Sequence, residues 1–223
     1  FVFRFFARGI AGGQVYNNQD GLGASIVLFV LVGPFERFFP RHDHQHFRRP
    51  NLKLDIGYAL ASPFLQAIGL VAAVIVGVMS FTWIPGLILR PYVQSIPDPY
   101  LLLVGVAMFD VASYWTHRWY HEVPQLWKFH AIHHSPEHMD WASGFRAHPF
   151  DGTLIAPAFF FLIAAGFSPE FSGFVAVVQI VLGLFLHANV RIWLKPLSKI
   201  IMTPEFHHWH HANEPEAIWC NYS

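Results

Sequence analysis

The sequence has one cysteine and few charged residues. Cys220 alone cannot form an internal disulfide bond or a thiolate cluster, so any bound metal must take nitrogen or oxygen ligands. Charged residues make up only 13% of the 223 residues, and 14 basic side chains balance 14 acidic ones. Because the chain has no net charge that would attract a polyanion, we expect no nucleic-acid partner.

The sequence also lacks internal repeats, low-complexity tracts and the residue alternation typical of strands. Hydrophobic residues make up 54% of the chain and aromatic residues 17%, which is too apolar for an ordinary water-soluble domain. We therefore predict an all-α fold. It is an integral membrane bundle of about four spanning helices, with a helical cap that carries clusters of histidine.

Five apolar stretches predict the helices of this bundle: 22–35, 56–81, 100–115, 153–165 and 171–186. The second is the clearest span, because at ~1.5 Å per residue it can cross a hydrocarbon core of ~30 Å. Residues 83–99 contain several prolines and predict a connection. The last two stretches predict a helical hairpin, in which Ser168 caps a helix that begins at Pro169.

A basic loop orients the bundle. Between Glu36 and Lys53, five basic residues outnumber two acidic ones, and the positive-inside tendency places this loop on the cytoplasmic side. Counted from there, the successive crossings bring every histidine cluster to the same cytoplasmic face. We expect one integrated domain in two regions. Residues 1–98 form an N-terminal membrane region, and residues 99–223 form a histidine-rich catalytic region whose C-terminus is expected to be truncated.

The chain contains 15 histidines, and three clusters of them repeat one spacing. Residues i, i+3 and i+4 of a helix lie on one face, so the imidazoles of each cluster converge. Pro124 is placed to begin the helix of the second cluster, and Thr203 and Pro204 to cap and begin that of the third. His187, after the last apolar stretch, reaches the same membrane surface. The clusters are His117 and His121; His130, His133 and His134; and His207, His210 and His211.

This repetition favours metal binding. One H-x-x-x-H pair is more simply explained as solvated or hydrogen-bonded histidines, but packing and solvation give no reason for the spacing to recur. Eight or nine imidazoles exceed the roughly four to six donors that fill one first-row coordination shell, so the count predicts two metal ions. Zinc fits such ligands and can replace iron during purification, but it has no redox chemistry. Iron and copper also accept such ligands, and iron is the metal expected if the site carries out oxidation.

Other histidines are given other roles. His148 is open between a metal ligand, a residue that orients a ligand and a helix-start residue. His208 lies ~100° around the helix from His207 and is expected to face elsewhere. Four more are expected to be solvated surface residues: His42, His44, His46 and His138.

Two further predictions concern the apolar segments. Asp110 lies in an apolar helix, where a carboxylate is costly to bury. It either orients a ligand imidazole or forms an ion pair with an arginine such as Arg118 or Arg146. The phenylalanine-rich segment 158–162 is a candidate wall for a lipid channel.

The histidine clusters and their flanking residues resemble a known family. The segment 110–121 reads Asp-Val-Ala-Ser-Tyr-Trp-Thr-His-Arg-Trp-Tyr-His, and His-Ala-Ile-His-His follows at 130–134. Residues 203–211 read Thr-Pro-Glu-Phe-His-His-Trp-His-His. These motifs resemble the histidine boxes of the sterol desaturase/fatty-acid hydroxylase superfamily, although His208 stands where relatives often have arginine.

The resemblance implies a di-iron centre on the cytoplasmic side of a four-helix membrane bundle. It implies an oxidoreductase that uses dioxygen and an external electron donor, cytochrome b5-like or ferredoxin-like, to hydroxylate or desaturate a lipid. The lipid is a sterol, a fatty acyl chain or a related molecule. The resemblance also implies that the eight clustered histidines are catalytic residues and that, with His187, they are the metal ligands.

Two other classes of function stay open. A membrane metal transporter also carries H-x-x-x-H pairs, but it needs polar ligands near the bilayer midplane, whereas these clusters follow the ends of helices. A non-catalytic histidine-rich zinc-binding membrane protein would need closed four-coordinate sites and no channel for an apolar substrate.

Overall fold

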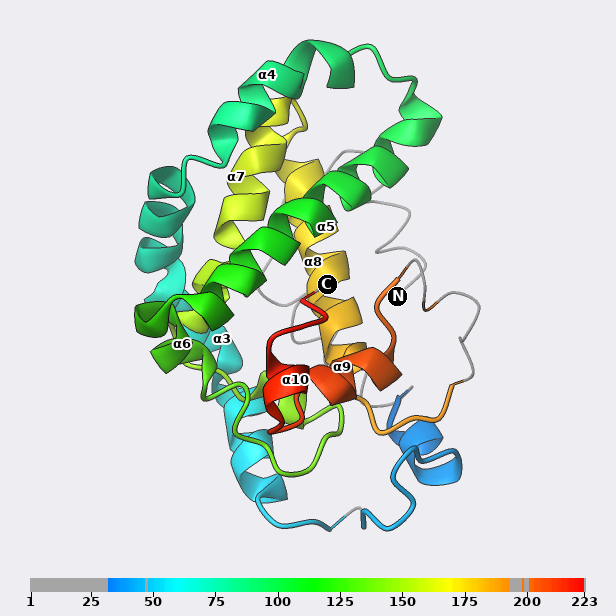
Figure 1. Ribbon diagram of the computed structural model, residues 1–223. Helices are drawn as coiled ribbons and strands as arrows, with labels where there is room; N and C mark the ends of the chain where they lie inside the picture. The colour runs from blue at the N-terminus through cyan, green and yellow to red at the C-terminus, as the bar shows by residue number, and fades with distance from the viewer. Residues whose placement is uncertain (1–31, 47, 193–197, 199–200, 223) are drawn as a thin grey trace.

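The computed structural model of the chain describes residues 32–46, 48–192, 198 and 201–222. The regular elements in these ranges are all helical, which confirms the all-α prediction (Figure 1). The labelled helices are α3 (Leu52–Met79), α4 (Trp83–Val93), α5 (Asp98–Glu122), α6 (Pro124–His130), α7 (Ala156–Ala165), α8 (Pro169–Leu186), α9 (Pro204–His210) and α10 (Pro215–Ile218). Two short 3-10 helices are η1 (Ser143–Phe145) and η2 (Asp151–Leu154).

Two of the described helices are long and apolar enough to cross a membrane, α5 with 25 residues and α8 with 18. A third span is α3, if its two parts, bent by 69°, are counted as one. The predicted stretches 56–81, 100–115 and 171–186 are thus confirmed as helices. The predicted stretch 22–35 lies mostly outside the described residues, so the number of spans stays a prediction.

The predicted hairpin forms, but its first arm is short. The Ser168 hydroxyl accepts a hydrogen bond from the backbone N–H of Phe171 at 3.1 Å, and α8 begins at Pro169. Gly166 ends α7 with a φ of 103°, a left-handed conformation that glycine adopts without strain. The 10 residues of α7 rise only ~15 Å, about half of a hydrocarbon core. Because α7 alone cannot complete a crossing, the membrane side of the histidine clusters stays a prediction.

The prediction of a connection at 83–99 is wrong for its first part, which forms α4. Pro91 lies inside this helix and supplies no N–H for an intrahelical bond. However, α4 packs along α7, and Gly86 lies so close to the backbone carbonyl of Phe161 that a larger residue would collide with it. Tertiary packing therefore outweighs the weak helix preference of this segment.

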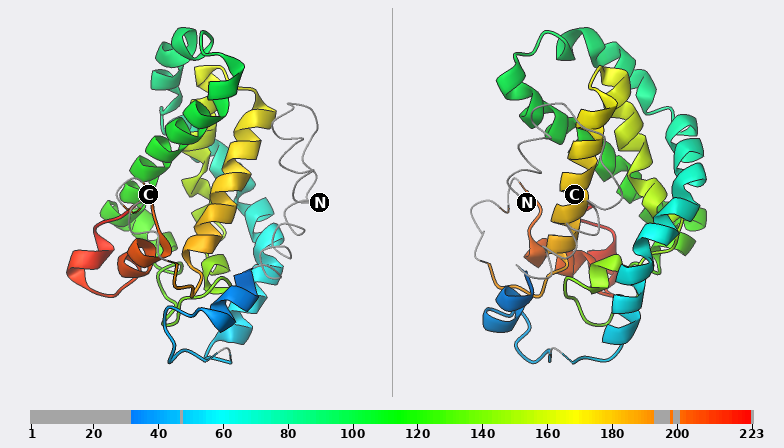
Figure 2. Two further views of the ribbon diagram at one scale, coloured as in Figure 1. Left: turned by 90° about the vertical axis from the view of Figure 1, so that its right-hand side faces the viewer. Right: turned by 180° about the vertical axis from the view of Figure 1, so that it is seen from behind.

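The helices α5, α7 and α8 share a hydrophobic core. Its fully buried members include Phe109, Leu162 and Val175, one from each helix. Ala158 and Leu162 of the segment 158–162 are fully buried in this core, whereas the three phenylalanines between them are half-buried, so the channel wall stays a prediction. Figures 1 and 2 show α5 and α8 ending at the same end of the bundle, where α9 and α10 lie.

Candidate metal centre

The nine histidines predicted as ligands come together at this end of the bundle. Eight of them form two groups, and within each group the candidate ligand nitrogens lie within 4.8 Å of one another. Group A is His117, His121, His134 and His210, and group B is His133, His187, His207 and His211. The ninth, His130, lies between them. Its Nε2 is 3.0 Å from that of His117, and its ring stacks on the ring of His133 at 5.1 Å.

The first cluster has the predicted helical geometry. His117 and His121 lie one turn apart near the end of α5, with ring centroids 5.0 Å apart. The third cluster also lies on a helix, α9, which begins at Pro204 as predicted. Thr203 occupies the N-cap position as predicted, but its hydroxyl makes no capping hydrogen bond.

The second cluster differs from the predicted helix. Pro124 begins α6, but α6 ends at His130, and His133 and His134 lie in the turn that follows. The N–H of His134 donates to the carbonyl of His130 at 3.1 Å, which keeps the three imidazoles close. Group A thus takes His134 and group B takes His133, so one turn supplies both groups.

The Nδ1 atoms of five histidines donate to fixed acceptors. Carbonyl and carboxylate oxygens in these contacts can only accept, so each Nδ1 must carry the proton. The pairs are His117 with the Tyr222 carbonyl (2.6 Å), His210 with Cys220 (2.6 Å), His187 with Gly183 (2.8 Å), His133 with Arg146 (3.2 Å), and His130 with the Asp151 carboxylate (2.9 Å). These acceptors leave the Nε2 atoms to face the centre.

Burial favours the neutral form of the candidate ligand histidines that lie outside the membrane-spanning helices. It lowers the pKa of His133 from 6.5 to about 3 and that of His187 to about 4. Burial and the neighbouring imidazoles lower the pKa values of four more histidines well below 6.5: His130, His134, His207 and His211. A neutral imidazole has one N–H and one lone pair, so an Nδ1–H tautomer leaves Nε2 with a bare lone pair.

Bare lone pairs therefore face each other in the centre. The Nε2 atoms of His133 and His187 are 3.1 Å apart, yet both Nδ1 protons are already used on carbonyl groups. The Nε2 atoms of His117 and His130 are 3.0 Å apart, and their Nδ1 protons are used on the Tyr222 carbonyl and the Asp151 carboxylate. Two acceptors at this distance repel each other unless a cation lies between them. Two nitrogens at ~2.1 Å from a shared ion are about 3.0–3.4 Å apart, which matches these separations.

Several ring nitrogens have no hydrogen-bond partner although they are buried. His134 and His211 have none at either ring nitrogen, and His210 has none at Nε2. Unpaired buried polar atoms are costly, and native structures seldom leave them without a ligand, water or ion. The donor set, the separations and these unpaired nitrogens all fit a pair of nitrogen-ligated metal ions.

Sequence reasoning missed Asp151, which accepts the hydrogen bond from His130. Both side chains are buried, and a carboxylate in this position fixes the tautomer and orientation of a ligand imidazole. The sequence offers Asp110 either for that role or for an ion pair with an arginine, but Asp110 is exposed and its carboxyl group forms a hydrogen bond with the Gln179 side chain. Neither predicted ion pair of Asp110 forms, because Arg118 pairs with Glu122 and Arg146 pairs with Asp55. The sequence gives only a weak indication of this role for Asp151, because the residue lies outside the histidine clusters.

Some of the remaining histidines lie on the surface, and others pack beside the two histidine groups. His44 and His46 are exposed, as predicted, whereas His138 is half-buried, which corrects its placement as solvated. His42 is also half-buried, which corrects its placement as solvated, and its ring stacks on that of His208 at 5.3 Å. His208 faces away from groups A and B and donates from Nε2 to the His187 carbonyl at 3.1 Å.

His148 acts as a helix-start residue. Its Nδ1 accepts a hydrogen bond from the backbone N–H of Phe150 at 3.1 Å, just before η2. Its ring packs against Phe129 at 4.9 Å. It lies outside both histidine groups.

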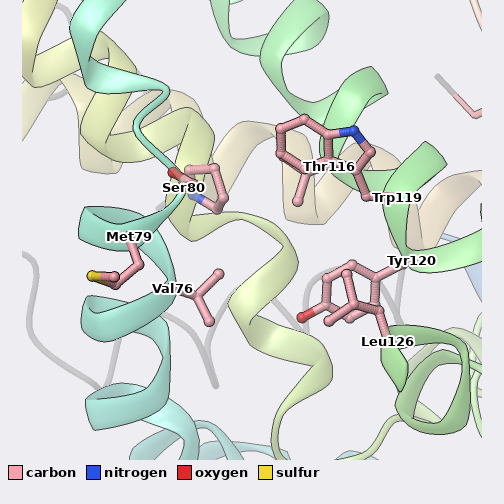
Figure 3. A pocket seen from close by; sticks show the side chains of 8 residues that line it. Val76, Met79, Ser80, Thr116, Trp119, Tyr120 and Leu126 are labelled. Atoms are coloured by element: carbon pink, nitrogen blue, oxygen red, sulfur yellow. The ribbon is translucent and has the colours of Figure 1, made fainter. Parts of the chain in front are cut away.

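An apolar cavity of about 240 Å³ lies beside the centre. Figure 3 shows Val76 and Met79 of α3, with Ser80 just after it, on one side and Thr116, Trp119 and Tyr120 of α5 on the other. The Tyr120 ring separates this cavity from the histidines, with its centroid 5.8 Å from that of His130. The Tyr120 hydroxyl hydrogen-bonds with the Thr153 hydroxyl, which holds the ring in place.

Comparison with known proteins agrees with this geometry. The sequence model of the Fatty acid hydroxylase family matches residues 102–223, which include all nine histidines. The chain belongs to the fatty acid hydroxylase family. This membership confirms the resemblance to the sterol desaturase/fatty-acid hydroxylase superfamily that the histidine motifs indicated.

The relatives of this fatty acid hydroxylase family member include a lipid hydroxylase and several monooxygenases. The chain is 28% identical over 199 residues to the ornithine lipid hydroxylase OlsE of Rhizobium tropici. This match covers 85% of the chain and 56% of the relative. The chain is 28% identical over 127 residues to alkylglycerol monooxygenase of Danio rerio, covering 56% of the chain and 27% of the relative. The human alkylglycerol monooxygenase is also 28% identical, over 124 residues, with the same coverage. The chain thus spans only part of the length of these relatives, and no solved structure matches it.

Proposed function

We propose that this chain is the catalytic region of a membrane-bound oxidoreductase that hydroxylates a lipid, using two iron ions held by nine histidines. The observation that carries the proposal is the set of bare Nε2 lone pairs facing each other at 3.0 to 3.1 Å in a buried site. Family membership and the names of the relatives support a lipid as the substrate. Because these names specify a hydroxylase and a monooxygenase, hydroxylation is favoured over desaturation.

Groups A and B would each hold one ion, and His130 would contribute its Nε2 beside group A. Bound iron supplies the redox chemistry that activates dioxygen for attack on a C–H bond, which zinc cannot supply. The chain's own residues orient and shield the ions. Asp151 and the backbone carbonyls of Cys220 and Tyr222 hold three imidazoles in one tautomer, so that their lone pairs point inward.

The apolar cavity beside Tyr120 is suited to part of the lipid's hydrocarbon chain. Most of its lining side chains come from α3 and α5, both candidate membrane spans, so a lipid could reach it from the bilayer without crossing water. The electron donor is proposed to be an external protein, cytochrome b5-like or ferredoxin-like. The basic loop at 36–53 supports a cytoplasmic location for the histidines, where such donors occur.

Metal analysis combined with lipid oxidation tests this function. The protein is expressed in iron-replete cells, purified anaerobically in detergent and supplied with a lipid extract, dioxygen and a chemical reductant. We expect about two irons per chain and lipid-dependent dioxygen consumption. His133→Ala removes one group B ligand and should abolish lipid oxidation, whereas His44→Ala, a change at an exposed histidine, should preserve it. Full lipid oxidation by the His133→Ala protein would overturn the proposal.

A further inference from the structure

Four buried charged side chains form a continuous chain of ion pairs next to group B. Arg49 donates to Asp140 from Nε (2.5 Å) and NH2 (2.6 Å) and lies 2.7 Å from Asp55. Arg146 donates from Nε to the other oxygen of Asp55 at 2.7 Å. All four residues are less than 9% exposed, and their formal charges cancel. We call Arg49, Asp55, Asp140 and Arg146 the ion quartet.

The ion quartet is joined to a ligand of group B. The backbone carbonyl of Arg146 accepts the Nδ1–H of His133, and the Arg146 guanidinium donates to the hydroxyl of Ser135, two residues further along, at 3.2 Å. The Arg146 backbone therefore orients the His133 imidazole, and the Arg146 side chain contacts the residue that follows His134. Asp55 fixes the position of Arg146 from the first turn of α3.

The ion quartet also shapes the segment that touches a second ligand of group B. The Asp140 carboxylate accepts hydrogen bonds from the N–H groups of Ala142 and Ser143, both at 3.0 Å, and so sets the start of η1. Gly144 in η1 lies against the ring of His187. A Cβ added at Gly144 would be 3.1 Å from the imidazole Cγ, closer than ordinary contact.

Group A is oriented by a different part of the chain. The carbonyls of Tyr222 and Cys220 in the C-terminal segment hold His117 and His210. His134 follows His133 in sequence, but its backbone N–H is held by the His130 carbonyl, and His130 in turn is held by Asp151. The ring N–H groups of His117 and His210 in group A are therefore held by other acceptors than those of His133 and His187 in group B. The two groups still share the turn of His133 and His134 and the helix α9.

We propose that the ion quartet is a positioning device for group B alone, so that the two metal positions can be emptied one at a time. This inference rests on the proposed two-metal centre. Removing one charge from a buried network leaves its partner uncompensated, which displaces the remaining side chains. The displacement passes through Arg146 to His133 and through η1 to His187, whereas the C-terminal supports of group A are unaffected.

Cobalt(II) titration of the metal-free, full chain in detergent tests the inference, because cobalt(II) bound to imidazole is read directly from its visible absorption. The wild-type protein should bind two equivalents. Asp55→Asn should bind one equivalent, with loss of the other. The matched control is Glu122→Gln, the same carboxylate-to-amide change in an exposed ion pair with Arg118, and it should bind two.

Gly144→Ala provides a second, charge-free perturbation, since it presses on His187 and leaves the ion quartet intact. In this variant, the cobalt(II) affinity of one site should fall at least tenfold, and the affinity of the other site should equal that of the wild type. If Asp55→Asn loses helical circular dichroism, Gly144→Ala alone decides the question. Two undisturbed equivalents in the deciding variant, or loss of both from a helical protein, would overturn the inference. Fewer than two equivalents in the wild type would instead overturn the two-metal proposal.

Discussion

Asp151→Ala is the change whose effect the structure defines best. The Asp151 carboxylate accepts the Nδ1–H of His130 at 2.9 Å, and the two side chains are only 8% and 3% exposed. Burial raises the pKa of Asp151, while nearby imidazoles act in the opposite direction. Alanine removes the acceptor, frees the His130 ring to rotate and leaves its N–H unpaired in a site with little access to water.

The expected magnitude follows from the cost of this lost bond. A buried hydrogen bond to a charged group contributes about 1.5–3 kcal/mol. Since about 1.4 kcal/mol corresponds to a factor of ten, metal affinity should fall by about 10- to 100-fold, the range typical for groups that orient a metal-bound histidine. The metal affinity of the Asp151→Asn protein should lie between those of the Asp151→Ala and wild-type proteins, because an amide oxygen can still accept this hydrogen bond.

Chelator competition measures this effect. Metal-loaded protein is equilibrated with a graded series of chelator concentrations, and the metal retained is quantified after desalting. Asp43→Ala is the control, because Asp43 is a carboxylate whose side chain is 82% exposed. Equal metal retention by the Asp151→Ala and Asp43→Ala proteins would refute the orienting role of Asp151 and weaken the assignment of His130 as a ligand.

Two further predictions concern pH and the cavity. The folded-state pKa of His187, about 4, is below its ordinary value of 6.5, so the unfolded chain binds more protons between these values. The free energy of unfolding of the metal-free protein should therefore decrease as the pH falls from 6.5 toward 4, by up to about 1.4 kcal/mol per pH unit for this histidine. A thermal midpoint that stays constant over this pH range would contradict the burial of His187 as a neutral imidazole. Val76→Phe narrows the apolar cavity and should lower lipid turnover about tenfold with an unchanged iron content, because overpacking acts on the substrate space and not on the ligands. Unchanged turnover of every lipid tested would show that the cavity does not hold the substrate.

Local sequence patterns were reliable where one short segment decides the structure. Pro169 and Ser168 define the start of α8, and the i, i+4 spacing of His117 and His121 places both rings on one face of α5. In these cases the determining contacts lie within one helical turn. The same reasoning failed for α4, whose prolines indicate a connection but whose apolar face packs on α7.

The sequence by itself determined the helical class, the histidine boxes and the expectation of a metal centre, because helical periodicity and imidazole chemistry are local properties. Only the tertiary structure decided how the boxes are shared between groups A and B, with His133 and His134 divided between them. It alone identified Asp151 and the carbonyls of Cys220 and Tyr222 as the acceptors that fix the ring tautomers. Those partners lie 10 to 105 residues from their histidines, and no local pattern records a hydrogen bond that exists only once the chain has folded.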